Sequence, residues 1–285
     1  MKAYTSNNIR NIAVLGHGGK GKTTLCEAML YIAGASDRLG RVADGNTVLD
    51  FDSEEKRRKS SVSSAIAALE WDNTKLNIID APGLFDFEGG AAEAVRAAEA
   101  VLIVTSAGSG VDVGTEKAFR AAEKKGAAKF FAVTKTDSDH RNFYKTFDAL
   151  KEVYGNKLCP TIIPYMEGNI TKCYVNLMTG MAFSYDENGK ATKVPVPEDS
   201  VIEEMTSAFM EAVATTDDAL MEKFFEGEKF TKEEILKGLC IGIFDGSIYP
   251  VYAVSGLTCA GVDQLLYGLA WSAPGAFGYA GEKCT

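Results

Sequence analysis

A glycine-rich segment near the start of the chain has the spacing of a phosphate-binding loop. It fits the pattern G-x-x-x-x-G-K-[ST], and its members are Gly16, His17, Gly18, Gly19, Lys20, Gly21, Lys22 and Thr23. Glycines let the backbone wrap closely, so that successive N–H groups point at phosphate oxygens. Lys22 would neutralise charge on the β- and γ-phosphates, and the Thr23 hydroxyl would bind Mg²⁺. A flexible glycine turn before a helix is the alternative interpretation.

Two further motifs each follow a short apolar run. Asp80-Ala81-Pro82-Gly83 offers a carboxylate that can hold the metal through water, and the N–H of Gly83 can meet a γ-phosphate. Thr134-Lys135-Thr136-Asp137 offers a carboxylate that can accept two hydrogen bonds from the edge of guanine, which adenine cannot supply. The stem of Lys135 would lie over the base. Each motif alone is common, but in this order behind the phosphate loop they indicate a guanine-nucleotide site.

The elements that must position these motifs alternate between strands and helices. Apolar runs predict buried strands at residues 11–15, 76–80, 100–105, 129–134, 159–164 and 248–254. Helical patterns occupy residues 22–34, 91–98, 115–124, 141–154 and 262–271. This alternation predicts an α/β fold with a doubly wound, mainly parallel sheet. The run 65–71 and the run after it are joined by a short turn, which predicts one antiparallel edge strand.

A segment of about residues 165–241 interrupts the alternation. It carries a hairpin signal at Asn188-Gly189 and three helical patterns, the last after Thr231. Residues 161–240 hold 15 acidic and 7 basic residues, a net charge of −8, whereas the whole chain has −9. We therefore predict one GTP-binding domain over residues 1–285, with an acidic α+β subdomain inserted into it.

Composition excludes several classes of protein. The net charge of −9 opposes a broad basic face for DNA, and no apolar run is long enough to span a membrane. The N-terminus is polar and has no apolar signal core. The cysteines are scattered without a C-x-x-C pair, which favours reduced thiols over a metal site: Cys26, Cys159, Cys173, Cys240, Cys259 and Cys284. We expect a cytoplasmic monomer.

Together these motifs resemble the translational GTPases, and elongation factor G most closely. The phosphate loop continues into Thr24 and is similar to the family's G-H-x-x-x-G-K-T-T. The run from Asp80 to Phe87 resembles D-T-P-G-H-x-D-F, and the run from Gly110 to Glu116 resembles G-V-x-x-x-T-E. Ser255 and Gly256 look like the family's base-contacting S-A pair. Elongation factor G also carries an insertion at the corresponding place, so the resemblance covers nearly the whole chain.

Three departures from the family pattern bear on function. Thr134 replaces the asparagine of N-K-x-D, and guanine recognition by Asp137 should survive this change. The family's metal-binding R-G-I-T corresponds to Arg58-Lys59-Ser60-Ser61, which makes Ser61 the candidate ligand. Ser60 leaves the register open, and a solvated serine-rich loop is the alternative. Leu84 replaces the histidine that orients the attacking water in the family, and leucine has no polar atom for that role.

The resemblance implies a GTPase that binds GTP or GDP with Mg²⁺ and hydrolyses GTP slowly without the ribosome. Its predicted catalytic residues are Lys22, Asp80, Gly83 and Ser61, and its metal ligands are Thr23, Ser61 and Asp80. The resemblance also implies that later domains are absent from this chain. It names the ribosome as partner of the full-length protein and the ribosomal stalk protein as partner of the acidic insertion. The basic run 56–59 falls in the first switch, where a contact with ribosomal RNA phosphate is a minority interpretation.

Two rival interpretations stay open. The first is a nucleotide-gated binding module that senses GTP without turnover, and Leu84 motivates it. The second is an ATP-dependent P-loop enzyme, which Asp137 opposes. The choice between a housekeeping elongation factor, a paralogue and a ribosomal protection factor also stays open.

Guanine recognition can be tested at one residue. We expect Asp137→Asn to shift the preference of the chain from guanine toward xanthine nucleotides, because the amide replaces an acceptor by a donor. Competition between GTP, XTP and ATP for the wild-type and variant chains measures this preference. Equal affinity of the wild-type chain for ATP and GTP would contradict the prediction.

Overall fold

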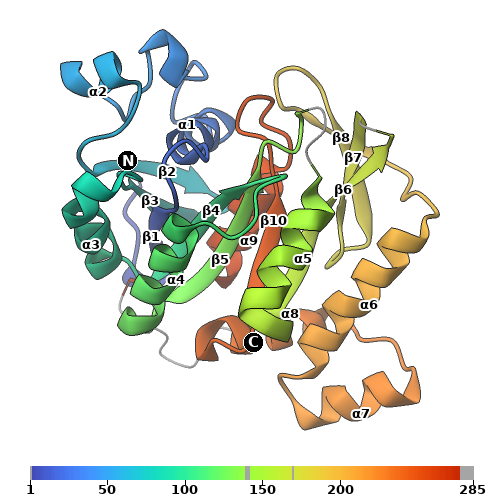
Figure 1. Cartoon of the computed structure of the whole chain (residues 1–285). Coiled ribbons are helices and arrows are strands. Elements are labelled where there is room, and N and C mark those ends of the chain that lie inside the picture. Colours follow the sequence, from blue (N-terminus) through green and yellow to red (C-terminus); the bar gives the residue numbers. More distant parts are fainter. Residues whose placement is uncertain (1, 139–141, 169, 277–285) are drawn as a thin grey trace.

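The computed structural model describes residues 2–138, 142–168 and 170–276. In this part of the chain ten strands form one sheet, in the order β2-β3-β1-β4-β5-β10-β6-β7-β8-β9 (Figure 1). The strands are β1 Ile9–Leu15, β2 Ala65–Trp71, β3 Thr74–Asp80, β4 Ala100–Ser106, β5 Ala128–Thr134, β6 Leu158–Glu167, β7 Ile170–Asn176, β8 Met181–Tyr185, β9 Ala191–Val194 and β10 Tyr249–Ala253.

The middle of the sheet is parallel, as predicted. Strands β3, β1, β4, β5, β10 and β6 run in the same direction, and β2 pairs antiparallel with β3 at one edge. Every residue of β4 and β5 is buried, which explains why both strands are apolar runs rather than alternating patterns. The prediction of a doubly wound α/β sheet with an antiparallel edge strand is confirmed.

The helices cover both faces of the sheet. Their bounds are α1 Lys22–Ile32, α2 Ser53–Arg58, α3 Glu88–Ala97, α4 Val113–Lys125, α5 Phe143–Tyr154, α6 Ser200–Ala214, α7 Asp218–Glu226, α8 Lys232–Asp245 and α9 Val262–Ser272. Short 3₁₀ turns lie at Ser6–Asn8, Val42–Asp44, Phe85–Phe87 and Gly155–Lys157. Helices α4 and α5 lie on the near face in Figure 1, and α9 lies on the far face beside α1. Among the described residues no helix is both long and apolar enough to cross a membrane.

Helix α5 begins two residues later than the predicted helix of residues 141–154. Its N-cap is Asn142, whose side chain accepts hydrogen bonds from the backbone N–H groups of Tyr144 and Lys145. Residue Arg141 lies outside the described residues, as does Cys284 among the cysteines. The other five cysteines are buried thiols.

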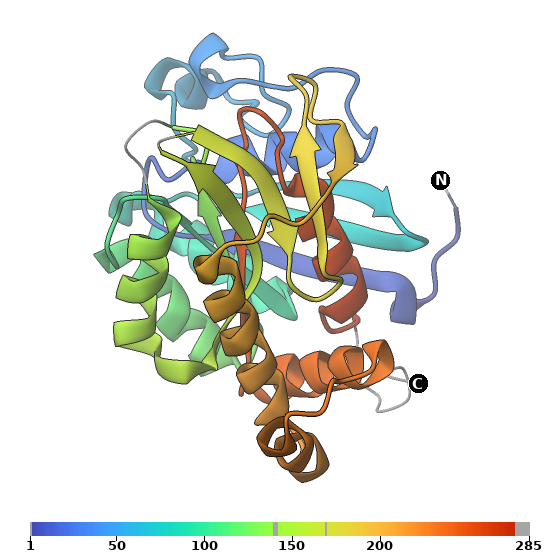
Figure 2. The ribbon, with the colours of Figure 1, turned by 90° about the vertical axis from the view of Figure 1, so that its right-hand side faces the viewer.

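The insertion shares the main sheet. Strand β6 extends to Glu167 and pairs antiparallel with β7, and β8 and β9 continue this edge, with the predicted turn at Asn188-Gly189 between them. The sheet therefore has antiparallel strands at both edges, whereas the sequence pattern predicted only one such strand. Helix α6 packs on β6, and α7 and α8 pack against α6 (Figure 2). The proposed bounds of 165–241 begin inside β6, so the insertion joins the domain through hydrogen bonds of the sheet.

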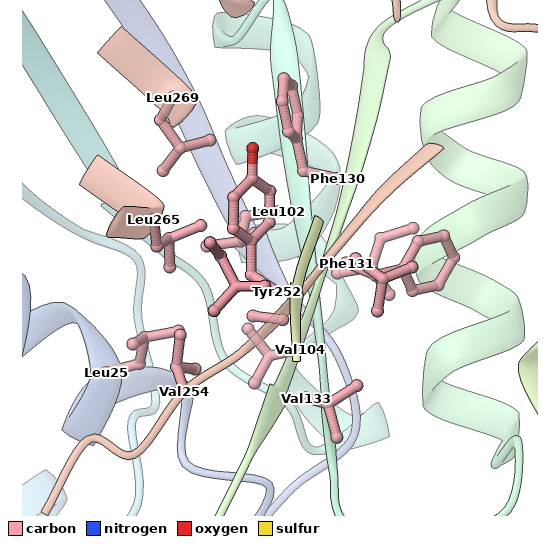
Figure 3. Packing of buried hydrophobic residues seen from close by; sticks show 14 of the residues in the cluster. Leu25, Leu102, Val104, Phe130, Phe131, Val133, Tyr252, Val254, Leu265 and Leu269 are labelled. Atoms are coloured by element: carbon pink, nitrogen blue, oxygen red, sulfur yellow. The ribbon is translucent and has the colours of Figure 1, made fainter. Parts of the chain in front are cut away.

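Large apolar side chains fill the space between the sheet and its helices. Figure 3 shows Leu265 and Leu269 of α9 on the same side of the sheet as the ring of Tyr252, and Leu25 of α1 beside Val254, while Phe131 points to the opposite side of the sheet. All of these side chains are 0–3% exposed. Because β1, β3, β5 and β10 are parallel, the loops that follow them meet at one edge, which brings the sequence motifs together.

Candidate nucleotide-binding site

The phosphate-binding loop connects β1 to α1 in a backbone conformation that requires glycine. Gly16 has φ 142° and Gly21 has φ 88°, both in the left-handed half of the map. A Cβ at Gly16 would overlap the carbonyl oxygen of Val104 on β4. Helix α1 begins at Lys22, so its N-terminal N–H groups and the loop N–H groups face the same space. This geometry is that of an anion-binding loop.

Lys22 is buried beside the second motif. Its side chain is 7% exposed, and its Nζ donates to the carbonyl oxygen of His17 at 3.1 Å. A Cβ at Gly83 would overlap this Nζ, so glycine is needed for the two loops to approach. Burial lowers the pKa of Lys22, although the carboxylate of Asp80 raises it. A buried ammonium group of this kind needs further acceptors, and phosphate oxygens would provide them.

Two hydroxyls and two carboxylates meet behind the phosphate loop. The Thr23 hydroxyl donates to Asp80 Oδ2 at 2.6 Å, and the Ser61 hydroxyl donates to Asp50 Oδ1 at 2.8 Å. The two hydroxyl oxygens are 3.0 Å apart. Within the described residues, the buried atoms Asp80 Oδ1 and Asp50 Oδ2 have no hydrogen-bond partner. Burial raises the pKa of Asp80 to about 7 and also raises the pKa of Asp50.

These oxygens fit a divalent cation. Magnesium is usually held by one or two carboxylates together with phosphate oxygens and water, and the unpartnered carboxylate oxygens match that need. The described residues contain no cluster of three or more His, Cys, Asp and Glu side chains that could hold a metal alone. A cation here would therefore also depend on the hydroxyls of Thr23 and Ser61 and on a bound phosphate. A nearby positive charge would favour the ionised forms of Asp80 and Asp50.

Sequence reasoning missed Asp50 and left the choice between Ser60 and Ser61 open. The hydroxyl of Ser61 points to the cluster, whereas Ser60 donates its backbone N–H to the carbonyl of Glu55 at 3.2 Å. Asp50 lies in an irregular segment with no motif of its own, and its role follows only from the contact with Ser61. This segment follows helix α1 and is therefore separate from the phosphate loop in the sequence.

Two buried glutamates hold the segment that carries Asp50 and Ser61. Glu27 of α1 is 0% exposed, and its Oε1 accepts from the backbone N–H groups of Val48 and Leu49 at 2.8 and 3.0 Å. Glu55 closes a capping box with Asp52 at the start of α2, and its Oε1 also accepts the backbone N–H groups of residues 62 and 63. The spacing D-x-x-E at the start of α2 is the sequence signal that could have located Glu55.

A buried threonine links the base-recognition motif to the phosphate loop. The Thr134 hydroxyl lies 2.7 Å from the carbonyl oxygen of Lys20, to which it donates, and 3.0 Å from that of Thr105. Lys135 adopts φ 60°, and its Nζ donates to the carbonyl oxygen of Gly19 at 2.8 Å. The hydroxyl of Thr134 thus connects the loop after β5 to the phosphate loop, and the side chain of Lys135 lies along the phosphate loop.

The remaining base-recognition residues lie around the same edge. Asp137 is exposed and lines a hollow of about 290 Å³ together with Thr258 and Ala260. Ser255 is buried, and its hydroxyl accepts the backbone N–H of Thr258 at 3.2 Å. A Cβ at Gly256 would lie 3.1 Å from the backbone of Thr24, so this loop packs directly on the first turn of α1.

Lys20 and His17 are predicted site residues and Leu84 is a departure from the family pattern, and the side chains of all three contact other residues of the protein. Lys20 donates to Ser109 at 2.8 Å and pairs with Asp112 at 3.2 Å, so its side chain is held by α4 and the loop before it. His17 packs edge to face on Phe85, with ring centroids 5.6 Å apart. Leu84 is 39% exposed, and its Cδ2 lies 2.9 Å from the position of a Cβ built at Gly18. The apolar side chain of Leu84 therefore lies against the phosphate loop at Gly18.

A parallel sheet with a phosphate loop after β1, a D-x-x-G after β3 and a base-recognition loop after β5 defines a P-loop GTPase domain that binds guanine nucleotides. The chain belongs to the family described as the elongation factor Tu GTP binding domain, which matches residues 7–274.

The relatives of known name agree with this family. The chain is 33% identical over 261 residues to proteins named "Elongation factor G-like protein" in two strains of Mycobacterium tuberculosis, CDC 1551 / Oshkosh and H37Rv. The match covers 90% of this chain and 36% of each relative, so the chain spans about a third of their length. A crystal structure of a protein from Thermus thermophilus matches with a TM-score of 0.88 and 35% identity, over 94% of this chain and 41% of that one.

The link made by Thr134 has a measurable consequence. We expect Thr134→Val to weaken GTP and GDP binding alike, by roughly three- to tenfold, because a typical hydrogen bond contributes about 0.5–1.5 kcal/mol. Titration calorimetry measures both affinities. The matched control is Thr105→Val on the adjacent strand, since the buried Thr105 hydroxyl has no partner within the described residues and should change neither affinity. Unchanged nucleotide affinity in Thr134→Val would contradict a connecting role.

Proposed function

We propose that this chain is the nucleotide-switch domain of an elongation factor G-like translational GTPase, and that it binds GTP or GDP together with Mg²⁺. The cluster of Thr23, Asp80, Ser61 and Asp50 is the observation that carries the proposal. This cluster joins the start of α1, through Thr23, to the segment that carries Asp50 and Ser61. Within the described residues, one buried carboxylate oxygen of Asp80 and one of Asp50 have no hydrogen-bond partner. A bound cation and a phosphate would satisfy both oxygens.

Each site residue has a defined task in this proposal. The loop N–H groups and Lys22 bind the β- and γ-phosphates, and the Gly83 N–H donates to the γ-phosphate. Thr23 and Ser61 would ligate Mg²⁺ directly, and Asp80 and Asp50 would hold its water ligands. The ion would neutralise charge between the phosphates. Asp137 accepts hydrogen bonds from guanine, while Lys135, Ser255 and Gly256 enclose the base.

The same contacts give the domain two states. Ser61 and Asp50 lie on one segment between α1 and β2. Glu27 of α1 accepts hydrogen bonds from the backbone of this segment, and Glu55 within the segment accepts a further one. Gly83 and Leu84 lie on a second segment beside Lys22 and Gly18. Both segments lie beside groups that would bind the γ-phosphate and its ion, so a bound γ-phosphate would add contacts to both segments and its loss would remove those added contacts.

Hydrolysis in this proposal is slow in isolation. Leu84 has no atom that can accept a hydrogen bond from water, so the chain orders the phosphates without orienting a nucleophile. Full turnover would then need the ribosome, and the later domains of the longer relatives would make that contact. The acidic helices α6 and α7 are the proposed contact for the ribosomal stalk protein. In this proposal the protein is cytoplasmic and monomeric.

Leu84 also favours a second candidate function. A domain with an intact nucleotide site and an apolar residue over the phosphate loop could report the presence of GTP to a partner without hydrolysing it. In that case the bound nucleotide would gate binding to the ribosome or to another protein. The two candidates differ only in turnover, and one assay separates them.

Phosphate release by the full-length protein, with and without ribosomes, tests the proposal. We expect tight GTP binding, little release alone and clear stimulation by ribosomes. Leu84→His should raise the stimulated rate by roughly 10²-fold, because a positioned acid–base group typically contributes 10²–10⁴-fold. Phe85→His is the matched control, since it adds a histidine at the next position, which contacts His17 rather than Gly18.

Two outcomes would change the conclusion. Tight GTP binding with no release under any condition would leave the non-hydrolysing module. Equal gains from Leu84→His and Phe85→His would contradict the role assigned to position 84.

A further inference from the structure

Strand β7 of the insertion lies against the loop that carries Asp137. This strand pairs with β6 and β8 in the outer part of the sheet (Figure 1). Two of its side chains reach the loop, Thr171 and Tyr174, and both form a hydrogen bond with Thr136, the residue before Asp137. The sequence motifs assign no task to β7, so its contact with the base-recognition motif is a finding of the structure alone.

Two buried hydroxyls connect β7 to the end of β10. The hydroxyl oxygens of Tyr174 and Thr136 are 2.7 Å apart, and the Thr136 hydroxyl donates to the carbonyl oxygen of Val254 at 3.0 Å. A threonine hydroxyl has one hydrogen, so the Tyr174 hydroxyl donates to Thr136. Thr136 is 3% exposed and Tyr174 is 4% exposed. Burial raises the pKa of Tyr174, and the charge of Asp137 raises it further, so the hydroxyl remains a donor at neutral pH.

The backbone next to Asp137 is held by the same strand. The Thr171 hydroxyl donates to the carbonyl oxygen of Thr136 at 2.9 Å. Lys135, on the other side of Thr136, adopts φ 60°, and a residue other than glycine keeps this conformation only where surrounding contacts hold it. Asp137 itself is exposed. The direction of its carboxylate therefore depends on the backbone that these contacts fix.

Tyr174 also lies against the second base-recognition loop. A Cβ at Gly261, the last residue of the loop that contains Ser255, would lie 3.5 Å from Cδ1 of the Tyr174 ring. The same ring packs edge to face on Tyr185 of β8, with ring centroids 5.6 Å apart. Tyr185 in turn donates its hydroxyl to Asp263 Oδ1 of α9 at 2.6 Å. One side chain of the insertion is thus held in place and lies beside both loops that would enclose the base.

We propose that Tyr174 and Thr171 are positioning residues for guanine recognition. Through Thr136 they hold the backbone that presents the carboxylate of Asp137 to the base. The insertion then contributes to the selection of the nucleotide, in addition to carrying the acidic helices. This inference rests on the proposed recognition of guanine by Asp137, and its test separates the two.

The ratio of the affinities for GDP and inosine diphosphate (IDP) measures this positioning. Hypoxanthine lacks the 2-amino group of guanine, so IDP forms one of the two hydrogen bonds that Asp137 would accept from GDP. A displaced carboxylate loses part of that difference. We expect Tyr174→Phe and Thr171→Val each to reduce the preference for GDP over IDP by roughly three- to tenfold, the range of a typical single hydrogen bond. Titration calorimetry of the chain with both nucleotides gives the ratio.

Two further variants mark the limits of the measurement. Asp137→Ala removes both acceptor oxygens and should abolish the preference for GDP over IDP. Tyr144→Phe is the matched control, because the Tyr144 hydroxyl donates to the carbonyl oxygen of Pro164 on β6 at 2.6 Å and not to Thr136. Its removal should leave the ratio unchanged, even if it costs stability. A general loss of stability therefore does not by itself produce the expected result.

Circular dichroism establishes that each variant is folded, and Thr171→Val carries the test if Tyr174→Phe does not fold. An unchanged ratio in the folded variant would overturn the positioning role, and so would an equal loss in Tyr144→Phe. In both cases a preference that Asp137→Ala abolishes would leave guanine recognition by Asp137 intact. Equal binding of GDP and IDP by the wild-type chain, or a preference that Asp137→Ala retains, would instead contradict that recognition and the positioning role with it.

Discussion

Parallel pairing of β1 with β3 is the constraint on which the site depends. It aligns Val14 with Asp80, and Ala81 then donates its backbone N–H to the carbonyl of Val14, so the phosphate loop and the D-x-x-G loop leave the sheet side by side. Thr23 thereby reaches Asp80 at 2.6 Å. The pairing of β5 with β4 and β10 brings the base-recognition loop to the same edge. Without this strand pairing the three loops would lie apart and could not contact one ligand.

The loops are joined to one another by buried hydroxyls and carboxylates more than by ion pairs. Thr134 reaches the phosphate loop, Glu27 reaches the segment before Asp50, and Ser61 reaches both Thr23 and Asp50. Such contacts are directional and short, so a change at one loop is carried to its neighbours.

The parts of the site that local sequence defines were predictable, and the parts that distant contacts define were not. The phosphate loop follows from glycine spacing between a strand and a helix, and Asp80 and Asp137 follow strands in the required order. Asp50 belongs to no motif with a fixed spacing, and its position in the site depends on its contact with Ser61. The antiparallel strands β7–β9 were also missed as part of the main sheet, because edge pairing is decided by non-local hydrogen bonds.

The most direct test of the switch compares the variants Ser61→Ala and Ser60→Ala. For each variant the affinity for a non-hydrolysable GTP analogue and the affinity for GDP are measured. Both are measured with Mg²⁺ and again after its removal by chelation. The account predicts that Ser61→Ala weakens the GTP analogue roughly tenfold, since hydrogen bonds to charged groups contribute about 1.5–3 kcal/mol, and leaves GDP nearly unchanged. Ser60→Ala should match the wild type. Equal weakening of both nucleotides by Ser61→Ala, or the same loss in Ser60→Ala, would contradict the account.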